Sequence, residues 1–569
     1  MKKFIFLFLL FALSISVSAQ LPPDTLALLD EYVEVADAAY EQKDYKQAAV
    51  YYEKSLKIDS NSNGLARLTA ESYAQANNPE KAIEYLKYFI EVQKNYGFTS
   101  FSEDIEENEL LHPIKDLEAF KELVKDLKVF EADEAEKERQ YAIQLKKQQK
   151  QLETALPHRD FLKKLEALDA SKVYEAIQNY NDFPKLEPIE DQCLFFWYQL
   201  NDTLELPFTM MLPEDYDPKK TYPVLIAMHG AVWAIDETDE RADQYRFYST
   251  SRYIYDLVEE YDMIVLAPFA NQAFNWLYPF DGFQMIPQML RKAKQFANID
   301  DDRVHLTGHS NGAAGSFNYL VKAPTQFAGF YGLNTKPKVY EAGTFLKNAQ
   351  NRHFYNIATD QDYYYPPAGI DSIEQVAKRL GITWDTDLYR GFPHWFPQFT
   401  ESKIAVEKMF AHTTTRKRNA YQSSLYWECD RVENGQVDWV EITDLDTLVE
   451  KATWHRTINF PIKGWVDVED ETKMIDTTKM AFDFPYHSGA IQAQYEANQF
   501  TISTSRVGGI KIYCSPKMVN FNDEIVVIIN DETVFEGKVE LDKNFMIQQF
   551  QKEFDRKLIW GTVLEFDDF

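Results

Sequence analysis

A serine between two glycines is the first feature of this chain that could do chemistry. Residues 306–315 read LTGHSNGAAG, in which Ser310 follows Gly308 by two positions and precedes Gly312 by two. Glycines at these positions suit a turn too sharp for side chains. A serine on such a turn can act as a nucleophile, but the same spacing also occurs in ordinary loops. The surrounding sequence must decide between the two.

The segments on either side of this serine favour the nucleophile. RVHLT before Gly308 predicts a strand, and NGAAGSFNYLVKA after Ser310 predicts a helix, which is the strand–turn–helix setting of a nucleophile elbow. The backbone N–H of Asn311 would then lie at a helix N-terminus, where free N–H groups and the helix dipole favour an anion. We therefore predict that Ser310 is a nucleophile and that the Asn311 amide donates to an oxyanion.

A serine hydroxyl is a weak nucleophile without a base and a group that orients the base. His394, in RGFPHWFPQF, follows the last expected strand of the region and is the predicted base. His353 begins a strand and is expected to pack or to face solvent, and His412 lies too close to the end of the domain. Asp360 and Asp362 both stand at the end of the strand HFYNIATD, so either could orient the imidazole.

A second oxyanion donor should come from the loop after an early strand. YPVLIAMHGAVW supplies one, because Gly230 lets the backbone turn so that the amide of Ala231 can point at the oxyanion. We expect His229 to be structural and hydrogen bonded beneath this loop, with a role as general base as the alternative.

These residues lie on a predicted parallel sheet. From about residue 192, short apolar runs alternate with helical segments, which indicates a parallel sheet covered on both faces. After about residue 412 the pattern alternates with a period of two residues and predicts an antiparallel β domain of the sandwich type over residues 413–569. A turn at Asn530-Asp531 and a helix over QFQKEFDRKL (549–558) are expected within it.

The chain before the sheet is predicted to be helical. In residues 20–130, small and aromatic residues recur at helical spacing in two segments that echo one another, beginning at Ala36 and at Glu71. A helix from Ile114 would cap them. Residues 131–190 begin with an almost continuously charged run, which is typical of a solvated linker helix.

Two segments of the chain resemble known families. ADAAYEQKDYKQAAVYYEKSLKIDSNS and ESYAQANNPEKAIEYLKYFIEV resemble tetratricopeptide repeats, with a plain helical bundle as the alternative. Residues 195–411 resemble the esterase and prolyl-oligopeptidase-like branches of the α/β-hydrolase superfamily in the motifs LPEDYDPKKTYPVLIAMHG, DDDRVHLTGHSNGA, ATDQDYYYP and GFPHWFP. The chain departs from that pattern at Ala313, where many relatives have glycine, and after Gly230, where a second glycine is missing.

The second resemblance implies a fold and a mechanism. It implies a central α/β-hydrolase domain over residues 191–412 with a mostly parallel sheet. In relatives the acid precedes a proline by about four residues, which selects Asp362 before Pro366. The implied reaction is acyl transfer by Ser310, His394 and Asp362, with no cofactor and no metal.

Composition and the N-terminus indicate where such a protein works. Residues 1–19 have a basic start, an apolar run and a small-residue end, and predict a signal peptide and a secreted or periplasmic protein. No later segment is long and apolar enough to span a membrane. The net charge of −30 disfavours nucleic acid and anionic membranes as partners. The cysteines, Cys193, Cys429 and Cys514, are too far apart for a metal motif and are expected to be buried, with one disulfide as the alternative.

Three functions remain open on the sequence alone. The first is a serine esterase acting on small-molecule or carbohydrate esters, because aromatic residues crowd the loops around the expected site and suit sugar rings or aryl groups. Packing between this domain and its flanking domains is the alternative role of these aromatic residues. The second is a prolyl-oligopeptidase-like peptidase, although no propeller precedes the catalytic domain. The third is a non-catalytic scaffold whose N-terminal repeats bind a protein partner.

Overall fold

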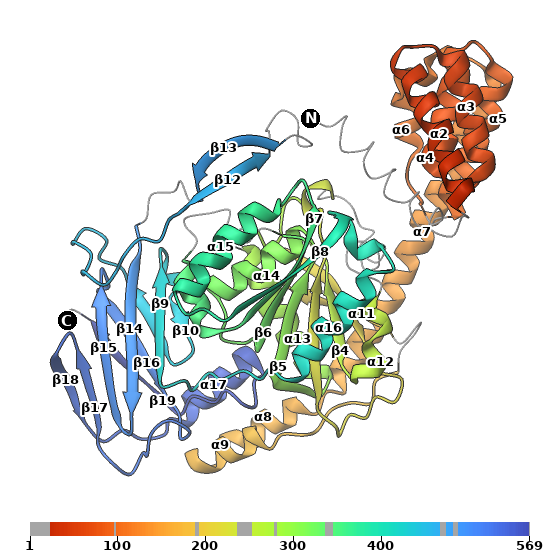
Figure 1. Ribbon diagram of the computed structural model, residues 1–569. Helices are drawn as coiled ribbons and strands as arrows, with labels where there is room; N and C mark the ends of the chain where they lie inside the picture. The colour runs from red at the N-terminus through yellow and green to blue at the C-terminus, as the bar shows by residue number, and fades with distance from the viewer. Residues whose placement is uncertain are drawn as a thin grey trace. The chain divides into compact units, whose positions relative to one another are not determined.

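The computed structural model describes residues 23–95, 98–187, 193–235, 253–277, 281–335, 345–466, 474–481, 487–567 and 569. The chain forms two compact units, Met1–Leu145 and Lys146–Phe569 (Figure 1). The predicted signal peptide, residues 1–19, lies outside the described residues. Among the described helices, none has both the length and the apolarity needed to cross a membrane.

The N-terminal unit is helical, as predicted. Its helices are α2 (Pro23–Glu41), α3 (Tyr45–Ile58), α4 (Asn63–Gln75), α5 (Pro79–Asn95) and α6 (Ser102–Glu107), followed by a 3₁₀ helix at Glu109–Ile114 and by α7 (Glu118–Thr154). Alanines and aromatic residues of these helices form one core. Small side chains let paired helices approach closely, and the larger rings fill the remaining gaps.

The turns inside the two echoing segments have the same construction. Lys43, before α3, and Asn77, before α5, both have positive φ, 61° and 57°. The next residue caps the helix in each case, because the side chain of Asp44 accepts from the N–H of Gln47 and that of Asn78 accepts from the N–H of Lys81. The two helical pairs are therefore built alike, while their membership of the tetratricopeptide family stays a prediction.

The expected capping helix and the charged linker helix form a single helix, α7, of 37 residues. No helix end marks the predicted domain boundary at residue 130. Beyond it, α8 (His158–Glu166) and α9 (Ala170–Gln178) pack in a small apolar core with α17 (Lys543–Glu553). The later part of the predicted linker thus contributes to the core of the second unit.

The second unit contains the predicted parallel sheet. Its strands are β1 (Cys193–Gln199), β2 (Glu205–Met211), β3 (Tyr222–Met228), β4 (Ile264–Pro268), β5 (Ile299–Gly308), β6 (Gly329–Leu333), β7 (Phe354–Gln361) and β8 (Trp384–Pro393). They are ordered β1-β2-β4-β3-β5-β6-β7-β8. Strands β3 to β8 are parallel, whereas β1 and β2 form an antiparallel pair at one edge, with β2 antiparallel to β4.

Helices cover both faces of this sheet, as the continuously apolar strands predicted. They are α11 (Tyr253–Asp256), α12 (Val258–Tyr261), α13 (Asp281–Phe296), α14 (Asn311–Lys322), α15 (Pro367–Arg379) and α16 (Ser402–Thr414) (Figure 1). In β3, Val224 and Ile226 pack with residues of α13, α14 and α15, while Leu225 and Ala227 pack with α11, α12 and α16. A strand that is buried on both faces has no polar side, so apolar and polar residues do not alternate along its sequence.

The C-terminal region forms several β sheets. One is ordered β10-β11-β16-β19 and another β18-β17-β15-β14-β9, and β12 (Pro461–Val466) pairs with β13 (Met474–Met480). The remaining bounds are β9 (Ser424–Cys429), β10 (Gln436–Val437), β11 (Val440–Asp444), β14 (Gly489–Glu496), β15 (Gln499–Ser505), β16 (Gly509–Cys514), β17 (Ile525–Ile529), β18 (Glu532–Gly537) and β19 (Thr562–Asp567). Ile442 and Ile510 of the first sheet share a core with Trp427 and Phe500 of the second, which is the packing of a sandwich.

Two expectations for this region are wrong in detail. The region is not purely antiparallel, because β15 and β17 pair in parallel; the chain between them crosses to the other sheet as β16 before it returns. The predicted helix over 549–558 ends at Glu553, where Phe554 has a φ of 52°. The next residues, Asp555 and Arg556, form buried ion pairs instead of continuing the helix.

The expected turn is confirmed, since Asn530 and Asp531 have positive φ between β17 and β18.

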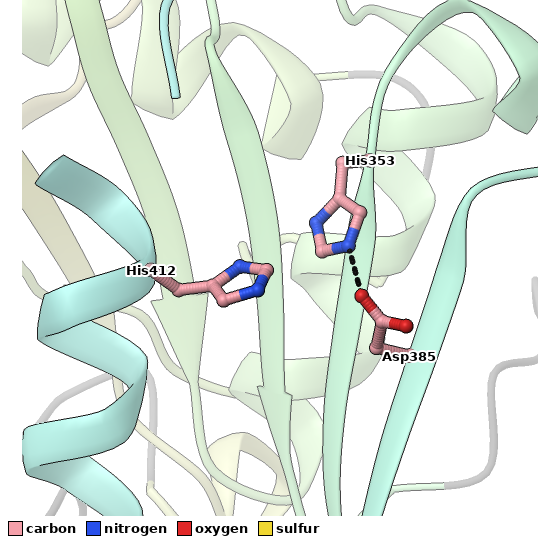
Figure 2. A group of neighbouring side chains, drawn as sticks. All are labelled: His353, Asp385 and His412. Atoms are coloured by element: carbon pink, nitrogen blue, oxygen red, sulfur yellow. Dashed lines mark hydrogen bonds and ion pairs between the residues drawn. The ribbon is translucent and has the colours of Figure 1, made fainter. Parts of the chain in front are cut away.

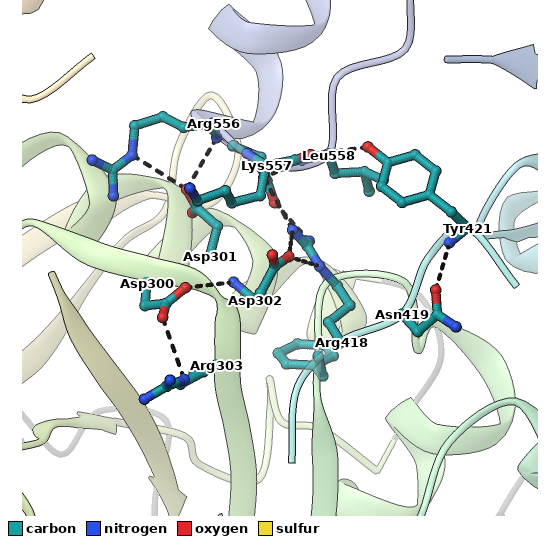
Figure 3. Close-up of polar contacts among 12 residues, drawn as sticks. Asp300, Asp301, Asp302, Arg303, Arg418, Asn419, Tyr421, Arg556, Lys557 and Leu558 are labelled. Atoms are coloured by element: carbon teal, nitrogen blue, oxygen red, sulfur yellow. Dashed lines mark hydrogen bonds and ion pairs between the residues drawn. The ribbon is translucent and has the colours of Figure 1, made fainter. Parts of the chain in front are cut away.

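A buried ion cluster joins the C-terminal segment to the start of β5 (Figure 3). Asp301 contacts Lys294 at 2.8 Å and Arg556 at 3.3 Å. Asp555 contacts Lys294 at 3.2 Å and Arg418 at 2.7 Å. Each of these five side chains is almost fully buried, so each charge depends on its partners in place of water.

The cysteines match their expected role. Cys193, Cys429 and Cys514 are buried and form no disulfide with one another. Cys429 and Cys514 pack in the apolar core of the C-terminal sheets, and burial raises the pKa of the Cys514 thiol to about 12.

Candidate active site

Ser310 lies on a strained turn between β5 and α14. Its backbone has a φ of 55° and a ψ of −116°, a region that non-glycine residues avoid unless the surroundings impose it. Both neighbouring glycines are required. A Cβ on Gly308 would lie 2.6 Å from the carbonyl oxygen of Met228, and one on Gly312 would lie 2.1 Å from the same atom. The glycines thus let the turn pack directly against the end of β3.

The predicted base and one of the two predicted acids lie beside this serine. His394 Nε2 is 3.0 Å from Ser310 Oγ, and His394 Nδ1 is 2.8 Å from Asp362 Oδ2. The imidazole and the carboxylate are almost fully buried, while the serine is half-buried. Side chains from the ends of β5, β7 and β8 therefore form one hydrogen-bonded chain at the carboxyl edge of the sheet, where ligands bind in open parallel sheets.

The carboxylate of Asp362 is fixed by four donors. Its Oδ1 accepts from the backbone N–H groups of Tyr364, at 3.0 Å, and Tyr365, at 2.9 Å. Its Oδ2 accepts from Asn334 Nδ2 at 3.2 Å as well as from His394. Donors on both oxygens hold the carboxylate in place, with one oxygen in line with the imidazole.

Asp360, the competing acid, points elsewhere. Its Oδ1 accepts from the N–H of Gly391 at 2.7 Å. The guanidinium of Arg390 lies 4.0 Å from its Oδ2. This carboxylate joins β7 to the end of β8 and takes no part in the chain that leads to the serine.

The two predicted oxyanion donors lie next to the serine. In the part of the chain that the structure describes, the N–H groups of Asn311 and Ala231 donate to no acceptor. Ala231 has a φ of 53°, which turns the loop sharply after β3. A Cβ on Gly230 would lie 3.1 Å from the Cβ of Ser310, so the loop and the turn are in contact. The side chain of Asn311 also accepts from the N–H of Val232 at 3.2 Å, which ties the loop to α14.

His229 has the structural role that was expected. Its Nε2 accepts from the N–H of Ala270 at 3.0 Å, so the ring proton is on Nδ1, which lies 2.8 Å from the oxygen of Gly230. Burial lowers the pKa of His229 to about 4. A neutral imidazole with both nitrogens engaged supports the loop from beneath and offers no free lone pair for base catalysis.

Two further polar residues of the site were not anticipated from the sequence. His309 Nε2 lies 2.9 Å from the backbone oxygen of His394, and the two rings are 4.8 Å apart. Asn334 contacts Asp362 and also Thr359, at 2.6 Å. His309 lies inside the glycine–serine motif, and this position alone indicates that its side chain is close to the site. Asn334 follows β6 with no motif around it.

Aromatic rings surround the imidazole. Tyr364, Tyr365 and Trp395 have ring centres 4.8, 5.5 and 5.1 Å from that of His394. The aromatic segment expected after Ala231 lies mostly outside the described residues, which resume at residue 253. The described rings screen the imidazole from water on several sides, which strengthens its hydrogen bonds.

Comparison with known proteins gives partial likenesses. No family model matches the chain, and no curated protein matches it. A thermostable esterase is 18% identical with a TM-score of 0.33, over 40% of this chain and 64% of that structure, so less than two thirds of the esterase is covered. The acylaminoacyl peptidase of Pyrococcus horikoshii is 15% identical with a TM-score of 0.32, over 40% and 42%. A ferulic acid esterase is 17% identical with a TM-score of 0.30, over 39% and 99%. The structural neighbours are thus esterases and peptidases, but likenesses of this strength carry no activity over to this chain.

Proposed function

We propose that this protein is a serine hydrolase that cleaves carboxylic esters through an acyl-enzyme intermediate. One observation carries the proposal: the continuous chain of hydrogen bonds from Asp362 Oδ2 through the imidazole of His394 to Ser310 Oγ, at 2.8 and 3.0 Å. A serine, a base and an orienting acid in this geometry are what nucleophilic acyl transfer requires.

The first step is attack by the serine. His394 Nε2 takes the proton as Ser310 Oγ forms a bond to the ester carbonyl carbon. Asp362 holds the other ring proton on Nδ1 and stabilises the imidazolium that results. As the tetrahedral intermediate collapses, the bond between the former carbonyl carbon and the ester oxygen of the leaving group breaks. The imidazolium gives its proton to that oxygen, so the leaving group departs as an alcohol and the acyl group stays on Ser310.

The oxyanion of the tetrahedral intermediate needs donors that are already in place. The N–H groups of Asn311 and Ala231 are free of other acceptors within the described residues. Because these donors are already in place, little rearrangement of the protein is needed when the negative charge develops on the oxyanion. Deacylation repeats the same proton transfers, with water in place of the serine hydroxyl as the nucleophile. This scheme uses only side chains and backbone of the chain itself.

The aromatic surroundings favour esters that carry rings. Tyr364, Tyr365 and Trp395 offer flat apolar surface beside the imidazole, which suits sugar rings or aryl acyl groups. Small-molecule or carbohydrate esters are therefore the proposed substrates. We further propose export through residues 1–19 and a protein partner for the N-terminal helical unit, on the sequence patterns described above.

Labelling with a fluorophosphonate probe tests the nucleophile. We expect covalent labelling of the full-length protein without its signal segment, and its loss in the Ser310→Ala variant. The Ser372→Ala variant is the matched control, because Ser372 lies on α15 with its hydroxyl bonded to the oxygen of Ala368. Folded wild-type protein that takes up no label would favour the non-catalytic scaffold instead.

A substrate panel separates the remaining functions. Acetyl, feruloyl and longer acyl esters of nitrophenol should be hydrolysed, whereas nitroanilides of short peptides should not. Amide hydrolysis with a kcat/KM as high as that for the esters would replace the esterase with a peptidase of the same mechanism.

A further inference from the structure

A second group of chemically competent side chains lies at the opposite edge of the sheet from the serine. His353 immediately precedes β7, and Asp385 is the second residue of β8. Because Phe354 pairs with Trp384 in parallel register, these two residues lie side by side at the amino-terminal ends of their strands. The predicted catalytic residues occupy the carboxyl ends. His412, near the end of α16, completes the group (Figure 2).

The three side chains are close enough to share one ion. One ring nitrogen from each histidine and one oxygen from Asp385 all lie within 4.8 Å of one another. His353 Nε2 is already 2.9 Å from Asp385 Oδ2. The Asp385 side chain is 56% exposed, and His412 is half-buried. The group is therefore open to solvent on that side, and two of its members can adjust to the 2.0–2.2 Å distances that zinc prefers.

Both imidazoles carry the lone pairs that a metal needs. Burial lowers the pKa of His353 to about 4, and burial also lowers the pKa of His412. The Nδ1 atoms of both rings are buried without a hydrogen-bond partner among the described residues, so neighbouring groups do not satisfy these rings completely.

Neighbouring side chains hold the ring of His412 in place and determine the charge around the group. Tyr355 stacks on His412 with ring centres 5.1 Å apart. Its hydroxyl donates to Asp387 at 2.5 Å, and the ammonium of Lys408 contacts the same carboxylate at 2.5 Å. Asp387 and Lys408 thus balance one another. Arg416 is the remaining charged neighbour, and its positive charge lowers the pKa of both histidines.

We propose that His353, Asp385 and His412 form a binding site for one divalent cation of the zinc type. Two imidazoles and a carboxylate are ligands that zinc and similar borderline cations prefer over magnesium or calcium. The three protein ligands leave a fourth position for water. Binding at Nε2 of His353 replaces its hydrogen bond to Asp385 and moves the ring proton to Nδ1.

The position of the group gives the ion a structural role. It would tie α16 to β7 and β8, and α16 is the last helix before the chain leaves for the C-terminal sheets. The proposed ester hydrolysis at the other edge of the sheet does not involve this ion.

Equilibrium dialysis of the metal-stripped full chain against zinc chloride tests the site, with the bound metal measured by elemental analysis. We expect the His412→Gln and Asp385→Asn variants to lose one equivalent, or to bind it at least about 10–100-fold more weakly. His112→Gln is the control, because His112 is an exposed histidine of the N-terminal unit. Its zinc binding should equal that of the wild type.

Two more measurements distinguish a specific site from adventitious binding. Saturating zinc should raise the Tm of the wild type by about 2–4 °C and leave that of His412→Gln unchanged. Arg416→Gln should tighten binding, because it removes the neighbouring positive charge. Wild-type protein that binds no more zinc than His412→Gln would overturn the proposal and leave the group as a buried hydrogen-bonded pair beside a packed histidine.

Discussion

Replacing Asp362 by asparagine should disable His394 by changing which ring nitrogen holds the proton. The N–H groups of Tyr364 and Tyr365 both donate to Oδ1 and cannot become acceptors, so the amide oxygen of the asparagine takes that position, and Asn334 Nδ2 loses its hydrogen bond to Oδ2. The NH₂ group of the introduced asparagine then takes the position of Oδ2, 2.8 Å from His394 Nδ1. A donor in this place forces Nδ1 to accept, because two donors cannot face one another.

The proton of the imidazole must then be on Nε2. That atom lies 3.0 Å from Ser310 Oγ, where it would donate to the hydroxyl and could no longer accept its proton. The same exchange in a Ser-His-Asp enzyme lowers kcat by about 10⁴. We expect a loss of about 10³–10⁴ in kcat here, which corresponds to roughly 4–5.5 kcal/mol of transition-state stabilisation.

The assay is steady-state hydrolysis of nitrophenyl acetate, together with the Tm of each variant. Asp360→Asn is the matched control, because the asparagine oxygen can still accept from the N–H of Gly391. Its kcat should stay within about threefold of the wild type. The reasoning fails if Asp362→Asn keeps kcat within tenfold of the wild type, or if Asp360→Asn is equally damaging.

Three other substitutions test the fold that holds the site. Gly312→Ala should lower kcat/KM by about 100-fold or more in nitrophenyl acetate hydrolysis, because its Cβ would lie 2.1 Å from the oxygen of Met228 and displace the serine turn; near-wild-type activity would show that the turn can relax. Arg418→Met removes one partner of a buried carboxylate and should lower the free energy of unfolding in urea by about 3–5 kcal/mol. Lys172→Met, at an exposed ion pair, should change it far less, and equal effects of the two substitutions would contradict this account. Burial lowers the pKa of His305 to about 3, so the unfolded chain takes up that proton first, and the free energy of unfolding should fall by about 1 kcal/mol between about pH 6.5 and about pH 5.5. His305→Phe should remove that part of the pH dependence in urea titrations, and an unchanged slope would refute the assignment.

The sequence was most informative where local pattern and catalytic geometry coincide. The glycines on either side of Ser310 predict a tight turn, because a Cβ at either position would overlap neighbouring backbone atoms. A parallel sheet places the carboxyl ends of its strands at one edge, and the chain order of serine, acid and histidine that accompanies a nucleophile elbow allowed His394 to be proposed from its place after the last strand. Asp360 and Asp362 could not be separated by residue type. What separates them is the direction of each side chain at the end of β7.

Contacts between distant segments were harder to predict. The bond from His309 to the backbone of His394 and that from Asn334 to Asp362 link residues far apart in the chain, and no local spacing reports them. The parallel pairing of β15 with β17 was missed because the crossover through another sheet leaves no periodic signal. The early end of α17 was missed because Asp555 and Arg556 look like ordinary helix-surface charges until their buried partners are known.

Strand β5 has a further consequence for how this protein can be divided. It begins at the buried charges around Asp301 and ends two residues before the predicted nucleophile, Ser310. Cutting the chain after the last helix of the α/β region would remove Arg418, Asp555 and Arg556 together. Of the buried ion cluster, Lys294 and Asp301 would then remain. The α/β region is therefore not a portable module, and an engineer who wishes to transplant it must include the C-terminal segment of the protein.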